Sequence, residues 1–159
     1  MENLADKLGL DNEQMAAILT LGDQLFRQGR LEEAKKVFEG LAALDETNPY
    51  FFAMLGAISQ QCRNFEDAVN WYTRALNIFS QDVHALTNRG ESYLNLQKLP
   101  QAAADFQGAI RLDQDGNNPA GSRARLLVEM TRQALALAAE KGAEGVLEAK
   151  RLIDEELAR

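Results

Sequence analysis

The chain has 159 residues, of which 26% are charged and 46% are hydrophobic, and its formal net charge is -7. This length suits one domain with a buried core, and only 3 prolines argue against a long disordered arm. The acidic balance makes nucleic acids and anionic membranes poor partners, because Lys and Arg supply most of the affinity for both.

Residues 1–10 carry Glu2 and Asp6 and lack a basic start before an apolar run, so they do not resemble a secretory signal. No window approaches 18 uninterrupted apolar residues, the length of a membrane-spanning helix. The single cysteine, Cys62, cannot form an internal disulfide, which fits a reducing compartment. We therefore expect a cytoplasmic protein, in which Cys62 is a packing residue.

Self-similarity with a period of 34 residues begins in the first predicted helix. Gly22, Gly56 and Gly90 lie 34 residues apart. In the same register fall three further sets: Ala34, Ala68 and Ala102; Phe38, Tyr72 and Phe106; Leu41, Ala75 and Ala109. This pattern is typical of the tetratricopeptide repeat (TPR), in which each repeat is a hairpin of two helices. The register is imperfect at Arg89, which replaces the apolar residue before Gly90.

The repeat predicts six helices, at about 13–28, 31–44, 49–62, 65–78, 83–96 and 99–112. A glycine in the first helix of a hairpin that faces an alanine in the second lets the backbones approach closely, and the aromatic residue one turn later fills the remaining wedge. We expect the repeats at 15–48, 49–82 and 83–116, after an N-terminal segment at 1–12.

After the third repeat, Pro119 begins a helix that can run to about Glu140 and cap the stack. A final amphipathic helix follows, with an apolar stripe at Val146, Ala149, Ile153 and Leu157. We expect this stripe to fold back onto the stack, and the alternative is that it meets a partner. The predicted fold is a single all-α domain, a right-handed α-solenoid of three TPR hairpins plus C-terminal capping helices at 117–159.

In a TPR stack the first helix of each repeat lines the concave wall, so helical projection predicts which side chains face a bound peptide. The predicted peptide-binding residues are Leu19, Asp23, Phe26, Tyr50, Ala53, Met54, Ala57, Gln60, His84 and Asn88, and Thr87 and Glu91 project the same way. The first two repeats offer apolar surface and the third offers hydrogen-bonding groups. An extended peptide that inserts apolar side chains suits this wall, although Phe26 and Met54 could also be core residues.

The run GRLEEAKKVFEGLAALD from Gly29 to Asp45, followed by NPYFFAMLGAISQQ from Asn48 to Gln61, resembles the class II chaperones of bacterial type III secretion systems. The resemblance implies a cytosolic chaperone that holds an apolar, proline-containing segment of a translocator protein in its groove. It also implies contacts from Leu19, Phe26 and the face around Met54. Asp23 departs from the family, which tends to carry an aromatic residue there. The N-terminal helix that the family uses for dimerisation is short here, so homodimer formation stays open.

Other functions fit less well. The carboxylate clamp of heat-shock co-chaperones needs Lys and Arg at first-helix positions that here hold Leu19, Asp23, Met54, His84 and Asn88. His84 and Cys62 supply too few ligands for a zinc site, and no common catalytic motif occurs, so we expect no enzyme, metal or cofactor. The alternative to a chaperone is a structural adaptor of a secretion or motility assembly, which would present its convex face or its final helix.

Overall fold

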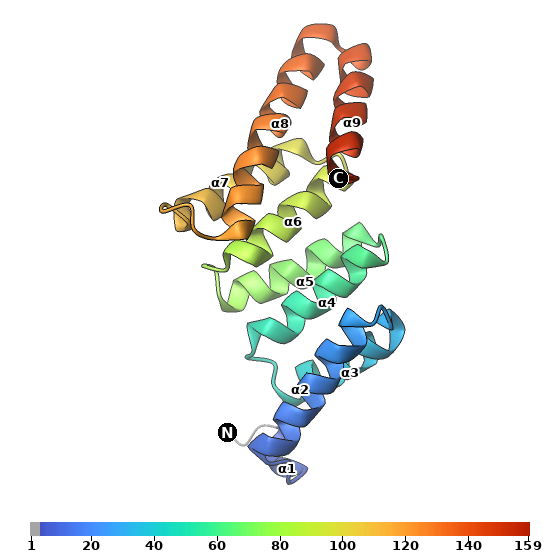
Figure 1. The fold of residues 1–159 in the computed structure, drawn as a ribbon, viewed down its shortest axis with the longest axis vertical. Helices are drawn as coiled ribbons and strands as arrows, with labels where there is room; N and C mark the ends of the chain where they lie inside the picture. Colours follow the sequence, from blue (N-terminus) through green and yellow to red (C-terminus); the bar gives the residue numbers. More distant parts are fainter. Residues whose placement is uncertain (1–3) are drawn as a thin grey trace. The chain divides into compact units, whose positions relative to one another are not determined.

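The computed structural model describes residues 4–159, and in that range every regular element is an α-helix (Figure 1). The helices are α1 (Leu4–Lys7), α2 (Asn12–Arg27), α3 (Leu31–Leu44), α4 (Pro49–Gln61), α5 (Phe65–Ile78), α6 (Val83–Asn95), α7 (Leu99–Leu112), α8 (Pro119–Lys141) and α9 (Ala143–Leu157). The all-α prediction is confirmed, and each predicted repeat helix begins and ends within about one residue of its expected bounds. The predicted segment 1–12 includes α1, and its first three residues lie outside the described range.

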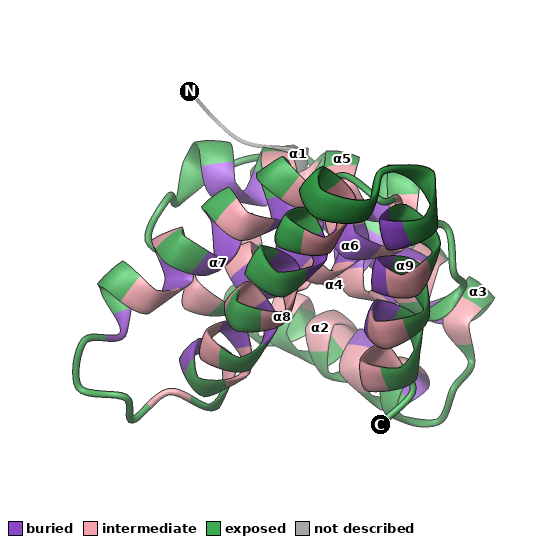
Figure 2. Cartoon of the chain, turned by 90° about the horizontal axis from the view of Figure 1, so that it is seen from above, coloured by how far each residue is buried: buried purple, intermediate pink, exposed green. Residues whose placement is uncertain are grey.

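The chain divides into two compact units, the first ending at Ser80 and the second beginning at Gln81. Helices α1 to α5 belong to the first unit and α6 to α9 to the second. Buried residues occupy part of the circumference of each helix and exposed residues the rest, as expected for amphipathic helices (Figure 2). The predicted repeat boundaries and the single domain remain predictions.

Each TPR hairpin closes where an aromatic ring of its second helix lies on a glycine of its first. A Cβ atom added to Gly56 would stand 2.8 Å from the Tyr72 ring, and one added to Gly90 would stand 2.5 Å from the Phe106 ring. The sequence suggested that an alanine would face each glycine, but the ring itself fills that place. Each ring occupies the space that a side chain at the glycine would need, and the alanines of the repeat are buried as well.

The third hairpin contains an ion pair at positions where the other two hairpins have apolar residues. The Nε and Nη2 atoms of Arg89 on α6 donate to the two carboxylate oxygens of Asp105 on α7, both at 2.7 Å. Arg89 also lies 5.9 Å from the centroid of the Tyr93 ring. The charged residue that breaks the repeat pattern at Arg89 is therefore paired with an acidic residue on the facing helix.

Helix α9 folds back against α8, as the sequence predicted. Ala149 and Ile153 are buried in the core of the second unit, and a Cβ on Gly145 would collide with the carbonyl oxygen of Leu137. The two backbones therefore approach closely at this glycine. The prediction that Val146 belongs to the packed stripe is wrong, because its side chain is 49% exposed.

Candidate functional site

The predicted peptide-binding residues of the first unit lie on two helices, with none of them fully buried. We call this set the α2–α4 face; α2 contributes Leu19, Asp23 and Phe26, and α4 contributes Tyr50, Ala53, Met54, Ala57 and Gln60. Four of these pack against the core of the unit and stay partly accessible, namely Leu19, Phe26, Ala53 and Met54. Phe26 and Met54 thus combine a packing role with an accessible surface.

Tyr50 and Asp23 connect the two helices of this face. The Tyr50 hydroxyl donates to Oδ1 of Asp23 at 2.8 Å, while its ring meets the Phe38 ring edge-on, with centroids 6.2 Å apart. Partial burial, followed by this hydrogen bond and the charge of Asp23, raises the pKa of Tyr50 to about 12. The side chain remains 42% exposed, so its ring is accessible, as the sequence predicted for Tyr50.

Gln60 is held by the second helix of its own repeat. Its Oε1 atom accepts a hydrogen bond of 2.9 Å from the hydroxyl of Tyr72, whose ring is buried on α5. This bond fixes the carboxamide at the last turn of α4. Any contact from Gln60 to a peptide carbonyl would therefore come from its amide nitrogen.

The predicted binding residues of the second unit lie on α6, where His84 is exposed and Asn88 is partly buried. Two further projections are corrected by the packing of α8. Thr87 is buried, with its hydroxyl 2.9 Å from the carbonyl oxygen of Val83 and 3.1 Å from that of Ala120. Helical projection could not show this, because it considers one helix and not what covers it.

Glu91, the second of these residues, belongs to an ion-pair network within the second unit. The guanidinium of Arg123 on α8 lies 3.0 Å from Glu91 on α6 and 3.4 Å from Glu156 on α9. The three side chains are partly buried, which strengthens their attraction relative to an exposed pair. Arg123 therefore joins α6, α8 and α9, and Oε1 of Glu91 is engaged in this network.

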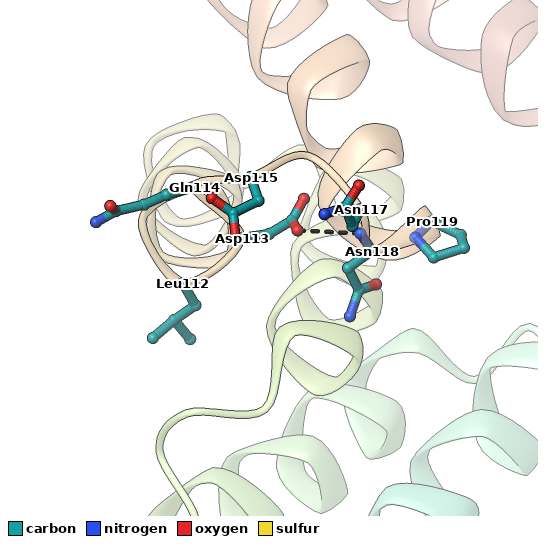
Figure 3. A pocket seen from close by; sticks show the side chains of 7 residues that line it. All are labelled: Leu112, Asp113, Gln114, Asp115, Asn117, Asn118 and Pro119. Atoms are coloured by element: carbon teal, nitrogen blue, oxygen red, sulfur yellow. Dashed lines mark hydrogen bonds between the residues drawn. The ribbon is translucent and has the colours of Figure 1, made fainter.

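A recess of about 360 Å³ lies at the loop between α7 and α8, lined by Leu112, Asp113, Gln114, Asp115, Asn117, Asn118 and Pro119 (Figure 3). The Asp113 carboxylate accepts hydrogen bonds from the backbone N–H of Asn118 at 3.0 Å and from Nη1 of Arg125 at 2.8 Å. The hydrogen bond from Arg125 lowers the pKa of Asp113. These polar groups hold the loop in place, and we assign them no binding role.

Sequence reasoning missed one cleft of the first unit, at Trp71 and Arg74 on α5. The repeat register contains the signal for it. The position of Trp71 holds Val37 and Asp105 in the other repeats, and the position of Arg74 holds a glycine in both.

Within residues 4–159, no His, Cys, Asp and Glu side chains form a group of three or more that could hold a metal ion. In the same range no helix is both long enough and apolar enough to cross a membrane.

A family model described as a tetratricopeptide repeat matches residues 60–119. The chaperone protein SicA of Salmonella typhimurium is 27% identical to this chain over 104 residues, which are 65% of this chain and 63% of SicA. The chain therefore spans slightly less than two thirds of the length of this relative.

Two solved structures are similar over most of the chain. A type III secretion system complex of Aeromonas hydrophila matches with a TM-score of 0.79 and 25% identity, covering 85% of this chain and 91% of that one. The Yersinia enterocolitica type III secretion chaperone SycD, in complex with a peptide of the translocator YopD, matches with a TM-score of 0.71 and 23% identity, covering 82% and 98%. These likenesses confirm the predicted TPR fold and the resemblance to secretion chaperones.

Proposed function

We propose that this protein is a cytoplasmic chaperone that holds an extended apolar segment of a client protein on the α2–α4 face. The observation that carries the proposal is the placement of Leu19, Phe26 and Met54, which pack against the core and stay partly accessible. Apolar side chains of a client that cover such surface gain roughly 25 cal/mol per Å² of apolar area removed from water. The likenesses to SicA and SycD support this reading.

Polar groups around these apolar side chains would fix the path of the segment. The bond between Tyr50 and Asp23 and the bond between Gln60 and Tyr72 hold the face in one arrangement, so that little side-chain entropy is lost on binding. His84 and Asn88, on α6 of the second unit, remain predicted binding residues whose side chains can hydrogen-bond a peptide backbone. The proposed client is a hydrophobic secretion substrate of the translocator kind, and keeping it soluble requires binding and no catalytic step.

A structural adaptor remains the second candidate function. The expected docking stripe on the final helix is mostly covered, since Ala149 and Ile153 are buried. What remains exposed is Val146 at 49% and Leu147 at 70%. On the final helix an adaptor would therefore use this short pair at the start of α9, and its other expected docking surface is the convex face.

The two functions are separated by co-expression with an aggregation-prone protein encoded beside this gene. Met54→Glu places a charge on the α2–α4 face, and Phe26→Ala removes a ring from it. Ala17→Glu adds the same charge at an exposed position of α2 outside the face and is the matched control. We expect the client to stay soluble with the wild type and with Ala17→Glu, and to aggregate with the other two variants.

Circular dichroism of each variant checks that the helices are intact. If client solubility is the same with Met54→Glu and Phe26→Ala as with the wild type, the α2–α4 face is not the binding site. If a partner is instead lost on replacing Val146 and Leu147 with Glu, the adaptor function is supported.

A further inference from the structure

A narrow and regular stripe of side chains holds α9 on α8, along which it runs back (Figure 1). Gly145, Ala149, Ile153 and Leu157 recur every four residues; the first three are buried and Leu157 is partly buried. Among the residues of α9, all of which the structure describes, Ile153 is the one large side chain that is buried. The helix also begins without a side-chain cap. Its attachment therefore depends mainly on one large apolar side chain.

The other three helices of the second unit are joined by contacts that do not involve α9. The hydroxyl of Thr87 on α6 donates to the carbonyl oxygen of Ala120 on α8, and Asp113 at the end of α7 is paired with Arg125 on α8. These helices also share buried apolar residues, namely Leu94, Ala102, Phe106, Ala109, Ala124 and Leu127. Such contacts would remain if α9 left, and the terminal element of a repeat stack opens more readily than the elements it covers.

The last turn of α9 is held at the side of α6 that helical projection predicts for a bound peptide. Arg123 on α8 donates to Glu91 on α6 at 3.0 Å and to Glu156 on α9 at 3.4 Å. Glu91 is in repeat register with Asp23 and Ala57, which belong to the α2–α4 face. The chain therefore brings its own final helix to a surface of the kind that binds peptides in the first unit.

A second residue of α6 shows the same covering. Leu94 is in repeat register with Phe26 of the α2–α4 face. Phe26 stays partly accessible, although α4 follows α2 as α8 follows α6. Leu94 is only 1% exposed and belongs to the same core as Ala149 and Ile153. The additional helix in the second unit is α9, so we attribute the lower exposure of Leu94 to it.

We propose that α9 is a built-in occupant of a helix-binding groove formed by α8 and α6, and that an amphipathic helix of a partner protein takes its place. The partner helix would carry the residue pattern of α9. This pattern has small residues at the positions of Gly145 and Ala149, aliphatic residues at those of Ile153 and Leu157, and an acidic residue at that of Glu156. The groove is separate from the α2–α4 face and would receive a helix, whereas that face would receive an extended segment.

Two contacts of α9 explain why this pattern suits the groove. A Cβ on Gly145 would collide with the carbonyl oxygen of Leu137, so a partner helix needs a glycine there to approach α8 as closely. An acidic residue at the position of Glu156 would restore the ion pair with Arg123, which otherwise keeps only Glu91. The contacts that α9 makes thus define the partner's chemistry.

Hydrogen exchange of the wild-type chain tests whether α9 separates from the rest of the unit. We expect the amides of residues 149–157 to exchange at least about tenfold faster than the buried amides of α6 and α8, through an opening that leaves these two helices protected. If the amides of α9 exchange only together with those of α6 and α8, the proposal is overturned. This measurement needs no variant.

Binding is tested with a fluorescein-labelled peptide of residues 143–159, titrated into the full chain and followed by fluorescence anisotropy. The wild type should bind this probe weakly, because its own α9 competes at a high effective concentration. Ile153→Asp places a charge in the buried stripe and should release α9, so this chain should bind the probe at least about tenfold more tightly. Leu147→Asp is the matched control, because it makes the same kind of change on the same helix at a side chain that is 70% exposed. It should bind as weakly as the wild type.

Changes in the probe identify the contacts it makes in the Ile153→Asp chain. A probe that carries Ile153→Asp should show no saturable binding. A probe that carries Glu156→Gln should bind about fivefold more weakly, because it loses a charge-assisted hydrogen bond. This difference should disappear when the chain also carries Arg123→Gln.

Equal binding of the probe by the wild type, Ile153→Asp and Leu147→Asp would overturn the proposal. Circular dichroism of Ile153→Asp gives a further test, since a loss of more helix than α9 contains would show that the unit does not fold without it, which also overturns the proposal. A wild-type dimer that Ile153→Asp converts to a monomer would show that two copies exchange α9, and a partner protein would then not be needed. None of these results bears on whether the α2–α4 face holds a client.

Discussion

The ion pair between Arg89 and Asp105 gives the sharpest test of how the third repeat is stabilised. The side chains are 18% and 8% exposed, and the two hydrogen bonds between them make a bidentate pair. In the second repeat the same positions hold Leu55 and Trp71. A charged contact thus stands where the repeat otherwise has an apolar one, and each charge depends on the other for solvation.

Removing one partner should cost more than removing both. Arg89→Leu leaves the Asp105 carboxylate buried without its cation, and loss of one member of a buried pair destabilises by about 3–5 kcal/mol. The double variant Arg89→Leu with Asp105→Val places at these positions the residue types of the first repeat, Leu21 and Val37. We expect its free energy of unfolding to lie within about 1 kcal/mol of the wild type, or above it.

Urea unfolding of the wild type, the two single variants and the double variant measures the coupling free energy, which should be about 3 kcal/mol or more. The control cycle uses Arg132 and Glu129 on α8, whose side chains are 68% and 54% exposed. Exposed pairs of this kind couple by less than about 1 kcal/mol. A coupling of that small size between Arg89 and Asp105 would refute the reasoning.

Three further predictions concern the first unit. Gly56→Ala should lower the free energy of unfolding by about 1–3 kcal/mol, because its Cβ would lie 2.8 Å from the Tyr72 ring. Gly40→Ala, in the interior of α3 with open space around it, should raise that free energy by about 0.5–1 kcal/mol, and urea unfolding tests both. The pKa of Tyr50, about 12, lies above its ordinary value of 10.0, so the folded state keeps this proton while the unfolded chain loses it. Stability from this group is present below pH 10 and should fall between pH 10 and 12; melting temperatures should fall less over that range in Tyr50→Phe, and an equal fall would contradict the prediction.

The helices could be predicted from the sequence because the 34-residue period reflects contacts inside each hairpin. The ring of Tyr72 on Gly56 is such a contact, and it recurs in every repeat. The exposure of Val146 could not be predicted in the same way. At Gly145 the backbones of α8 and α9 approach closely, and the next residue points about 100° away around the helix, toward solvent. The sequence of an apolar stripe does not show which of its residues lie closest to the helix that packs against it.

Helical projection predicts which side of a single helix is accessible, but it does not predict which side chains a neighbouring helix covers. Projection placed Tyr50 and Met54 correctly on an accessible side of α4, because the buried side of that helix is fixed by its own hairpin. It misplaced Thr87, since the covering helix α8 lies outside the three repeats.

Asp23 shows what the structure adds to the resemblance. An aspartate at a position where the related chaperones tend to carry an aromatic residue would suggest a gap in an aromatic lining. Here the Asp23 carboxylate accepts the hydroxyl proton of Tyr50, whose ring lies edge-on to Phe38 and stays partly exposed. The α2–α4 face therefore has an aromatic ring next to Asp23, which α4 supplies, in addition to Phe26 on α2. Asp23→Asn should weaken the hydrogen bond that orients this ring, but it keeps the ring. Tyr50→Ala removes both the ring and the hydrogen bond. We therefore expect Tyr50→Ala to reduce client binding more than Asp23→Asn.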